Sequence, residues 1–200
     1  DPPLARKLNV EVTALLAELA ADLPFIFFST DLVFDGKHGH YDEAAPVNPL
    51  SVYAETKVAA EKIVLSNPRH TVVRTTLNFG VSPTGDRSFA EEMRLAWQAG
   101  KTLKLFTDEF RSPIPSEVTA RAVWELASLP RPGLYHLGGA ERLSRWEIGQ
   151  ALTPWYQELA GQLQPGSVRA YVGVPRPPDL SMQCDKLQGL LSFRLSGLRA

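Results

Sequence analysis

A short apolar run, Phe25–Phe28, limits the architectures that this chain can adopt. Its four residues are continuously apolar, Pro24 precedes them, and the polar residues Ser29–Asp31 follow at once. Unbroken apolarity over so short a run is typical of a strand in a parallel sheet, covered on both faces. The preceding segment, Leu4–Asp22, has helical spacing, so we expect a helix that packs an apolar stripe on this sheet. That stripe consists of Leu8, Val12, Leu15, Leu16 and Leu19.

Helical and strand patterns alternate along the rest of the chain. The predicted helices are Ser51–Ser66, Phe89–Ala99, Ser116–Leu129 and one that opens with a capping box at Ser144–Glu147 and is interrupted by Pro154. The predicted strands are Thr71–Leu77, Thr102–Phe106 and Leu134–Leu137, and the tail from Gln164 is expected to be irregular until Lys186–Leu191. Connections of crossover length between such strands indicate an α/β fold, a parallel sheet with helices on its faces.

Composition and charge exclude several classes of protein. The 200 residues are 44% hydrophobic and 22% charged, which is ordinary for a globular domain. The 21 basic and 22 acidic side chains give a formal net charge of -1, so the whole chain has no electrostatic footprint for nucleic acid or an anionic membrane. No apolar stretch approaches the roughly 20 residues that span a bilayer, and the N-terminus lacks signal-peptide features. We therefore expect a cytoplasmic protein with a small-molecule or protein partner.

Tyr53 and Lys57 stand four residues apart on the predicted helix 51–66, so they share one face of it. An ammonium beside a phenol favours the phenolate and brings a pKa near 10 toward the range of acid–base catalysis. Thr30 follows the apolar strand, and ligands of open parallel sheets bind outside the carboxyl ends of the strands. The pair also occurs by chance on many helices, and the long ordered pattern around it favours the catalytic interpretation.

The chain resembles the extended short-chain dehydrogenases/reductases, within them the dTDP-4-dehydrorhamnose reductase-like branch. The resemblance covers essentially the whole chain, and Ser29–Gly36 and Tyr53–Glu61 are its most specific segments. It implies a Rossmann-like doubly wound sheet and a smaller α/β substrate-binding part. The other segments that carry it are Asn9-Val10, Asp108–Ile114, Arg176–Asp179 and Asp185–Leu187.

The resemblance also implies a reaction, the reduction of a 4-keto nucleotide sugar with NADP or NAD as cofactor. Tyr53 would donate a proton to the substrate carbonyl, Lys57 would lower the tyrosine pKa and hold the nicotinamide ribose, and Thr30 would hydrogen-bond the reacting oxygen. The remaining expected site residues are Asn9 in a proton relay, Phe28 together with Tyr53 at the cofactor, and Asp31, Leu32, Leu77 and Arg111 at the sugar nucleotide. Leu77 stands where rhamnose-forming members usually carry a tryptophan, which puts that particular sugar in doubt.

One part of the family pattern is missing from this sequence. These enzymes begin with a strand and a Gly-rich turn that holds the pyrophosphate, and the sequence has no such turn. We expect residues 1–78, completed by about 113–138, to be the C-terminal half of the cofactor domain, and 79–112 with 139–200 to be the substrate-binding part. About 60 to 80 residues of strand–helix units would complete it, and without them a sheet edge and helix faces should be exposed. The resemblance further implies a homodimer.

Alternative interpretations stay open. Within the same fold, a nucleotide-sugar epimerase or dehydratase is an alternative, and so is a non-catalytic regulatory protein similar to the regulatory subunit of methionine adenosyltransferase. The segment His38–Glu43 carries possible metal ligands, but a polar loop is the commoner explanation, and we assign no metal site. Arg111 and Arg176 are candidates for holding a nucleotide phosphate or are solvated surface arginines. The residues assigned to packing are His136, Cys184, Trp97, Trp124, Trp146 and Trp155.

Overall fold

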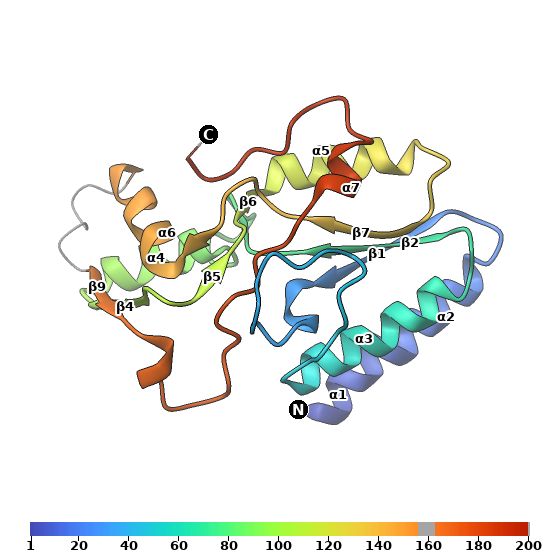
Figure 1. Ribbon diagram of the computed structural model, residues 1–200. Helices are drawn as coiled ribbons and strands as arrows, with labels where there is room; N and C mark the ends of the chain where they lie inside the picture. The colour runs from blue at the N-terminus through green and yellow to red at the C-terminus, as the bar shows by residue number, and fades with distance from the viewer. Residues whose placement is uncertain (156–162, 200) are drawn as a thin grey trace.

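The centre of the protein is a parallel sheet of three strands (Figure 1). The computed structural model describes residues 1–155 and 163–199. Strands β1 (Phe25–Thr30), β2 (His70–Thr75) and β7 (Gly133–Leu137) lie in the order β1-β2-β7, and both neighbouring pairs are parallel. Helix α3 (Val52–Leu65) connects β1 to β2, and α5 (Ser116–Ala127) precedes β7. The predicted α/β fold with a parallel sheet is confirmed.

Helices lie on both faces of this sheet, as Figure 1 shows. On one side α3 packs beside a continuous helical segment that consists of α1 (Pro2–Arg6), a π-helical turn (Lys7–Glu11) and α2 (Val12–Leu19). On the other side α5 and α7 (Asp185–Gln188) enclose a core with β2 and β7. The fully buried residues of this core include Val73, Ile114, Ala122, Leu137 and Leu187.

The apolar stripe predicted on the first helix does not face the sheet. Leu8 is 55% exposed, Leu15 54% and Leu19 73%. The buried residues of α2 are Thr13 and Ala17, which are four apart and form the face that meets α3. Small side chains let the two helices approach closely, so the leucine face of the same helix is turned away from α3. The prediction of a buried stripe was therefore wrong for Leu8, Val12, Leu15, Leu16 and Leu19 in this structure.

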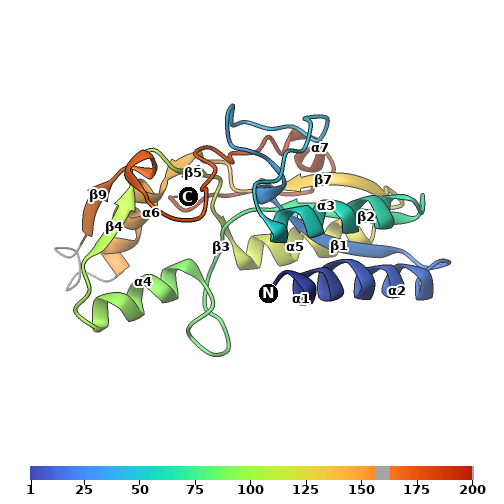
Figure 2. The ribbon, with the colours of Figure 1, turned by 90° about the horizontal axis from the view of Figure 1, so that it is seen from below.

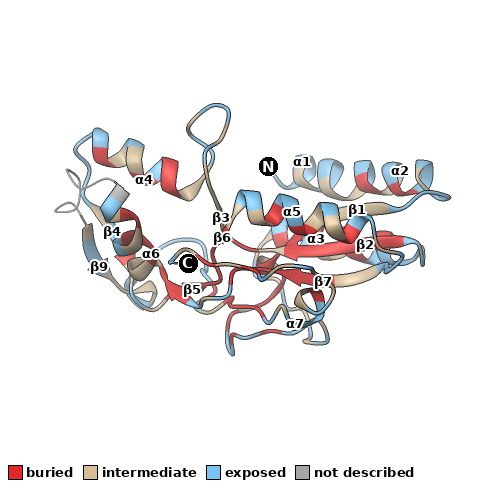
Figure 3. Cartoon of the chain, turned by 90° about the horizontal axis from the view of Figure 1, so that it is seen from above, coloured by how far each residue is buried: buried red, intermediate tan, exposed pale blue. Residues whose placement is uncertain are grey.

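Strand β1 is less buried than its apolar sequence predicted. Phe25–Phe27 are half-buried and Phe28 is 43% exposed, whereas Val72 and Val73 of β2 are fully buried. The cause is strand order, because β1 lies at the edge of the described sheet and β2 lies between two strands. Figure 3 shows this contrast between a buried central strand and a more exposed edge.

A second group of elements packs beside the sheet (Figure 2). Strand β4 (Leu103–Phe106) pairs in parallel with β9 (Leu163–Gly166), and α4 (Phe89–Gln98) and α6 (Arg145–Leu152) cover them around the buried Trp97. The predicted capping box at Ser144 and Glu147 opens α6, and Pro154 lies in the 3₁₀ turn that follows it. The tail is more regular than predicted, because β9 finds a partner in β4, which is distant in sequence.

Two short pairings connect the sheet to the second group. Strand β3 (Asn78–Phe79) pairs with β6 (Ile114–Pro115), and β5 (Phe110–Arg111) pairs antiparallel with β8 (Leu143–Ser144). Strand β3 follows the carboxyl end of β2 in the chain, so the β3–β6 pair lies at that end of the sheet. The space between the two groups therefore opens where an open parallel sheet binds its ligands.

The single residues assigned to packing have mixed outcomes. Trp97 and His136 are buried as predicted, and Trp146 and Cys184 are half-buried against the cores. Trp124 is 77% exposed, because it lies on the outer face of α5, so its assignment to the core was wrong. The side chain of Trp155 lies outside the described residues.

Within the described ranges, none of the helices has the length and apolarity that crossing a lipid bilayer requires.

Candidate active site

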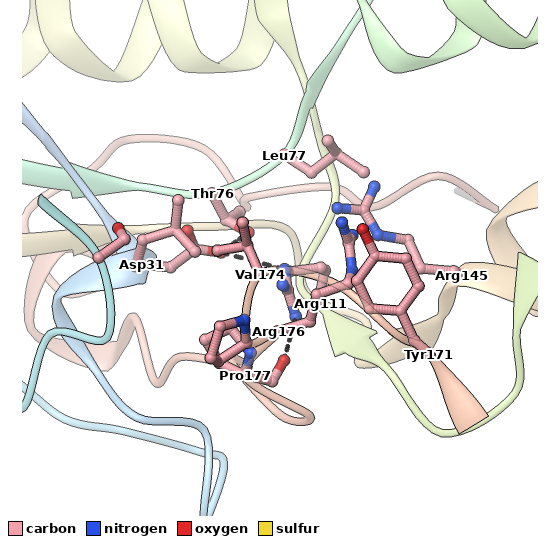
Figure 4. A pocket seen from close by; sticks show the side chains of 12 residues that line it. Asp31, Thr76, Leu77, Arg111, Arg145, Tyr171, Val174, Arg176 and Pro177 are labelled. Carbon is pink, nitrogen blue, oxygen red and sulfur yellow. Dashed lines mark hydrogen bonds and ion pairs between the residues drawn. The ribbon is translucent and has the colours of Figure 1, made fainter. Parts of the chain in front are cut away.

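A cavity of about 440 Å³ lies at the carboxyl ends of β1 and β2, between the sheet and the second group (Figure 4). Four of the predicted substrate residues, Asp31, Leu32, Leu77 and Arg111, line it. Thr30 is buried, and its hydroxyl donates to Oδ1 of the lining residue Asp31 at 3.2 Å. The other lining residues, which the sequence analysis did not assign together, are Ser51, Thr76, Arg145, Tyr171, Val174, Pro175, Arg176 and Pro177.

Asp31 is a buried carboxyl group in the wall of this cavity. Thr30 ends β1 and caps the 3₁₀ turn Asp31–Val33 by accepting a hydrogen bond from the backbone N–H of Leu32, which directs Asp31 inward. The Thr76 hydroxyl donates to Asp31 Oδ2 at 2.8 Å, and Arg111 Nε lies 3.8 Å from the same oxygen. Burial outweighs these contacts and raises the pKa of Asp31 above its ordinary range.

Glu109 is a completely buried carboxylate behind the cavity, and three arginines of the cavity wall surround it. Arg111 Nη2 lies 3.1 Å from it, Arg145 Nε 3.0 Å and Arg176 Nε 2.6 Å. Burial alone raises the pKa of Glu109, but the Arg176 hydrogen bond and the three cationic charges outweigh burial and hold the pKa below its usual value. The Glu109 carboxylate therefore binds guanidinium groups from three separate parts of the chain: Arg111 of β5, Arg145 of α6 and Arg176 of the tail.

The two phosphate-binding candidates differ in exposure. The Arg111 side chain is 5% exposed and also donates to the backbone carbonyls of Phe110 and Pro177, so the alternative of a solvated surface arginine is wrong for it. The Arg176 side chain is 37% exposed. Figure 4 shows both at the cavity together with Arg145 and Tyr171. The two candidates thus share one site, and the structure adds Arg145 to them.

Tyr53 lies in the first turn of α3, next to Thr30 and Asp31. Ser51 caps this helix by accepting from the backbone N–H of Ala54, and Ser51 itself lines the cavity. The phenol is 45% exposed. Partial burial and the Asp31 charge raise its pKa, and a hydrogen bond with Thr30 acts in the opposite direction. The predicted lowering of the Tyr53 pKa is therefore not found in this structure.

The position of Lys57 explains why the pKa of Tyr53 is not lowered. Its Nζ donates to the backbone carbonyl of Phe28 at 2.6 Å and lies 4.0 Å from the centre of the Phe27 ring. Burial lowers the pKa of Lys57, and the Glu61 carboxylate partly restores it. The ammonium is thus fixed to the edge of β1, on the same face of α3 as the phenol but directed to the strand backbone.

Asn9 contacts the tyrosine helix, although it does not contact the phenol. Its Nδ2 donates to Thr56 Oγ1 at 3.0 Å, and that hydroxyl donates to the carbonyl oxygen of Tyr53 at 2.7 Å. The π-helical turn Lys7–Glu11 presents Asn9 to α3 in this way. The structure places Asn9 where it supports the backbone of the Tyr53 turn.

The loop His38–Glu43 is held against the rest of the protein by hydrogen bonds. Glu43 accepts a hydrogen bond from the backbone N–H of His136, and the backbone N–H of His40 donates to Ser181 Oγ. Over residues 1–155 and 163–199, no group of three or more His, Cys, Asp or Glu side chains is arranged to hold a metal ion.

The full length of the sequence, residues 1–200, matches the family described as RmlD substrate binding domain. The dTDP-4-dehydrorhamnose reductase of Sinorhizobium fredii is 31% identical over 210 residues, which cover 98% of this chain and 70% of that protein. The chain belongs to the RmlD substrate-binding-domain family. Methionine adenosyltransferase 2 subunit beta of Bos taurus is 28% identical across 94% of the chain, and the chain spans 59% of its length.

Solved structures support the RmlD-like fold. The dTDP-4-dehydrorhamnose reductase of Bacillus anthracis, in complex with NADP, matches with a TM-score of 0.86 at 20% identity, over 97% of this chain and 71% of that one. A hypothetical dTDP-4-dehydrorhamnose reductase of Sulfolobus tokodaii matches with a TM-score of 0.82 at 28% identity, over 96% and 67%. Structures of dTDP-glucose 4,6-dehydratases in complex with NAD also match, at 20–21% identity.

Sequence reasoning missed Thr76, Arg145 and Glu109 as parts of the site. Glu109 stood inside the segment Asp108–Ile114, which carried the resemblance, but its burial follows from contacts with arginines 36 and 67 residues away. Thr76 was expected at the end of its strand, and the strand instead ends at Thr75, which frees Thr76 to turn toward Asp31.

Proposed function

We propose that the protein to which this chain belongs reduces a keto group, at the 4-position, on a nucleotide-activated sugar with NADPH or NADH. One observation carries the proposal: Tyr53 and Thr30 meet beside a cavity whose wall combines a buried carboxyl group with three arginines. A hydroxyl-rich sugar needs hydrogen-bonding groups, and a diphosphate needs guanidinium groups, and this cavity offers both. The 31% identity to a dTDP-4-dehydrorhamnose reductase supports the same activity.

The described residues fit the nicotinamide end of such a cofactor. Phe28 is exposed on the edge strand β1, Lys57 lies against its carbonyl group, and Tyr53, one turn earlier than Lys57 on α3, is half exposed. In our proposal Lys57 and the backbone at Phe28 hold the ribose of the nicotinamide. The cofactor, when bound, supplies the hydride, and all other roles belong to the side chains of the chain.

Tyr53 donates the proton in this proposal, and Thr30 orients the carbonyl oxygen. The raised pKa leaves the phenol protonated at neutral pH, as a proton donor must be, although it makes Tyr53 a weaker acid than a free tyrosine. The Thr30 hydroxyl donates to Asp31 Oδ1 at 3.2 Å, and Thr30 and Asp31 both affect the pKa of Tyr53, so the three side chains lie close together. The arginines Arg145 and Arg176 would bind the diphosphate, since both lie in the cavity wall and are less buried than Arg111.

A Tyr53→Phe substitution in the full-length protein tests this assignment. Turnover of a 4-keto nucleotide sugar should fall by about 10²–10⁴-fold, the typical contribution of a general acid, while the dissociation constant of the sugar nucleotide stays within about threefold. Tyr135→Phe is the matched control, because Tyr135 is buried in the other core and donates to the carbonyl of Arg131. Full activity of Tyr53→Phe would overturn the proposal.

A second candidate function is a regulatory one. It is favoured by the 28% identity, across 94% of the chain, to the beta subunit of methionine adenosyltransferase 2. A protein of that kind would bind a nicotinamide cofactor or a nucleotide without turnover of any 4-keto sugar, and it would associate stably with a methionine adenosyltransferase. Size-exclusion chromatography of a mixture with a purified methionine adenosyltransferase distinguishes the two functions. A regulatory protein would elute in a complex with the transferase, whereas a reductase would elute separately from it.

A further inference from the structure

A row of three buried polar side chains crosses the sheet. Ser29 on β1, Arg74 on β2 and His136 on β7 occupy one line of the register, because Ser29 pairs with Arg74 and Arg74 pairs with His136. All three side chains are buried, at 4%, 4% and 0% exposure. Arg74 Nη1 lies 3.4 Å from His136 Nε2, and His136 Nδ1 lies 3.1 Å from the carbonyl oxygen of Tyr41. These contacts fit a neutral imidazole that accepts from Arg74 and donates to Tyr41.

Helix α3 supplies the partner of this row, Glu61. Arg74 binds it in a bidentate manner, with Nε donating to Oε1 at 2.9 Å and Nη2 to Oε2 at 2.7 Å. The Ser29 hydroxyl also donates to Oε1. Both side chains of the ion pair are 5% exposed. A buried ion pair contributes little to stability compared with an apolar pair of similar volume, so its presence here calls for another reason.

The place of Glu61 on its helix indicates that reason. Tyr53, Lys57 and Glu61 are spaced by four residues and follow one another along one face of α3. Three consecutive residues of β1 face this side of the helix: Thr30 lies close enough to Tyr53 to affect its pKa, the carbonyl of Phe28 accepts from Lys57, and Ser29 donates to Glu61. The carboxylate is thus the last of three contacts that hold α3 against the carboxyl end of β1.

We propose that Glu61, clamped by Arg74 and Ser29, is a positioning residue that fixes the height of α3 on the sheet and places a carboxylate one helical turn from the Lys57 ammonium. The catalytic meaning of this inference rests on the proposed function, in which Tyr53 and Lys57 act. Arg74 is anchored in the central strand, which has a neighbour on each side, so it provides a rigid reference for a helix that packs on both β1 and β2.

The electrostatics of the region agree with the geometry. Burial lowers the pKa of Lys57, and the charge that raises it again is that of Glu61. The other titratable or charged groups around the pair are Tyr53 on α3, Asp31 beyond β1, Arg74 on β2 and His136 on β7. The pKa of His136 is lowered to about 4, and Asp31 has a raised pKa. His136 is therefore neutral at pH 7, and Arg74 and Glu61 form the fixed charge pair beneath Lys57.

The test is the titration of Lys57 in the full-length protein, followed by NMR of its ¹³Cε signal, in the wild type and in Glu61→Gln. Glutamine keeps the shape of the side chain and removes its charge, so the pKa of Lys57 should fall by about one unit. The alkaline limb of the kcat profile should move to lower pH by the same amount. At neutral pH kcat should fall by roughly 10- to 100-fold with KM within about threefold, because misplacement of the reacting groups lowers kcat.

Val64→Ala is the matched control, because Val64 is fully buried on the same helix and carries no charge. It should lower stability while leaving the Lys57 pKa and the pH profile unchanged. The double variant Glu61→Gln/Arg74→Gln leaves no unpaired buried charge, so it replaces Glu61→Gln in the test if that single variant does not fold. Because it also lacks the Glu61 charge, it too should show a lowered Lys57 pKa.

An unchanged Lys57 pKa in Glu61→Gln or in the double variant would overturn the inference, and so would a kcat loss no larger than that of Val64→Ala. The titration needs no substrate. A protein without reductase activity whose Lys57 pKa still falls in Glu61→Gln would contradict the proposed function and leave the electrostatic part of this inference standing.

Discussion

Replacement of Glu109 by glutamine should destabilise this protein more than replacement of any exposed carboxylate. Glu109 is 0% exposed, and Arg111, Arg145 and Arg176 all lie within 3.1 Å of its carboxylate oxygens. Glutamine retains one acceptor oxygen but leaves the guanidinium groups without their counter-charge. Two of the three arginines are largely buried, so water replaces the lost carboxylate only in part.

The expected magnitude is about 3–5 kcal/mol of unfolding free energy, the usual cost of removing one partner from a buried charge pair. With a urea m-value of about 2 kcal/mol/M for a protein of this size, the denaturation midpoint should fall by roughly 1.5–2.5 M. The assay is urea unfolding followed by tryptophan fluorescence. Glu18→Gln is the control, because Glu18 is exposed on α2, and it should change the unfolding free energy by no more than about 0.5 kcal/mol.

The difference in unfolding free energy between wild type and Glu109→Gln should also depend on pH, in a direction that the pKa of Glu109 determines. The folded-state pKa of Glu109 lies below its ordinary value, so the carboxylate contributes its stabilisation fully above the unfolded pKa of about 4.3. That contribution is lost as the pH falls through the folded pKa. The stability difference between wild type and Glu109→Gln should therefore be largest at pH 6–7 and should narrow below about pH 4.3. A difference under about 0.5 kcal/mol at pH 7, or one that does not narrow in acid, would refute the reasoning.

Three further predictions concern groups outside the cavity. Between pH 6.5 and 4 the wild type should lose about 3 kcal/mol more unfolding free energy than His136→Asn. Burial and Arg74 lower the pKa of His136 to about 4, so the imidazole of the unfolded chain is protonated at a higher pH than that of the folded protein. Urea unfolding at a series of pH values measures this difference. Gly39→Ala should lower the unfolding free energy by roughly 1–3 kcal/mol, since φ at Gly39 is +67° and a Cβ there would collide with the Asp179 carboxylate. Gly100→Ala is the control, because φ is +69° there but a Cβ meets no atom. The difference between the two variants in thermal unfolding gives the cost of the collision alone. Cys184, whose pKa is raised to about 12, should resist iodoacetamide at pH 7.5 in the folded protein and react within minutes once unfolded, as mass spectrometry would show.

The sheet could be predicted from the sequence because its signals are local. The run Phe25–Phe28, the run within 71–77 and the run Leu134–Leu137 each carry their own apolar pattern, and the crossover helices between them require parallel pairing. The order β1-β2-β7 then follows from the chain passing from one strand to its neighbour.

Which face of a helix is buried was harder to predict. On the first helix the leucines form the more apolar face, yet the small residues Thr13 and Ala17 meet α3. Burial there depends on the neighbouring helix and on an edge strand with one partner in the described sheet, and neither property is encoded in the spacing of leucines. Trp124 illustrates the same limit on α5.

The candidate site was predicted where motifs named single residues and was missed where distant residues combine. Asp31, Leu77 and Arg111 were assigned to the substrate and all line the cavity. The grouping of Arg145 with Glu109 depends on the antiparallel pairing of β5 with β8, which joins segments about 33 residues apart. The roles of Thr30, Tyr53 and Lys57 in a reaction stay predictions, and the pKa of Tyr53 shows that the helix spacing alone did not determine its electrostatics.

The stoichiometry of cofactor consumption tests the central proposal most directly. The full-length protein would be mixed with a limiting amount of a dTDP-4-keto-6-deoxy sugar and excess NADPH or NADH, and the oxidised nicotinamide and the sugar product would both be quantified. The proposal predicts one equivalent of oxidised cofactor for each sugar reduced at its 4-position. Conversion of the sugar without net cofactor oxidation would indicate an epimerase or a dehydratase, and binding without conversion would indicate a regulatory protein; either result would contradict a reductase.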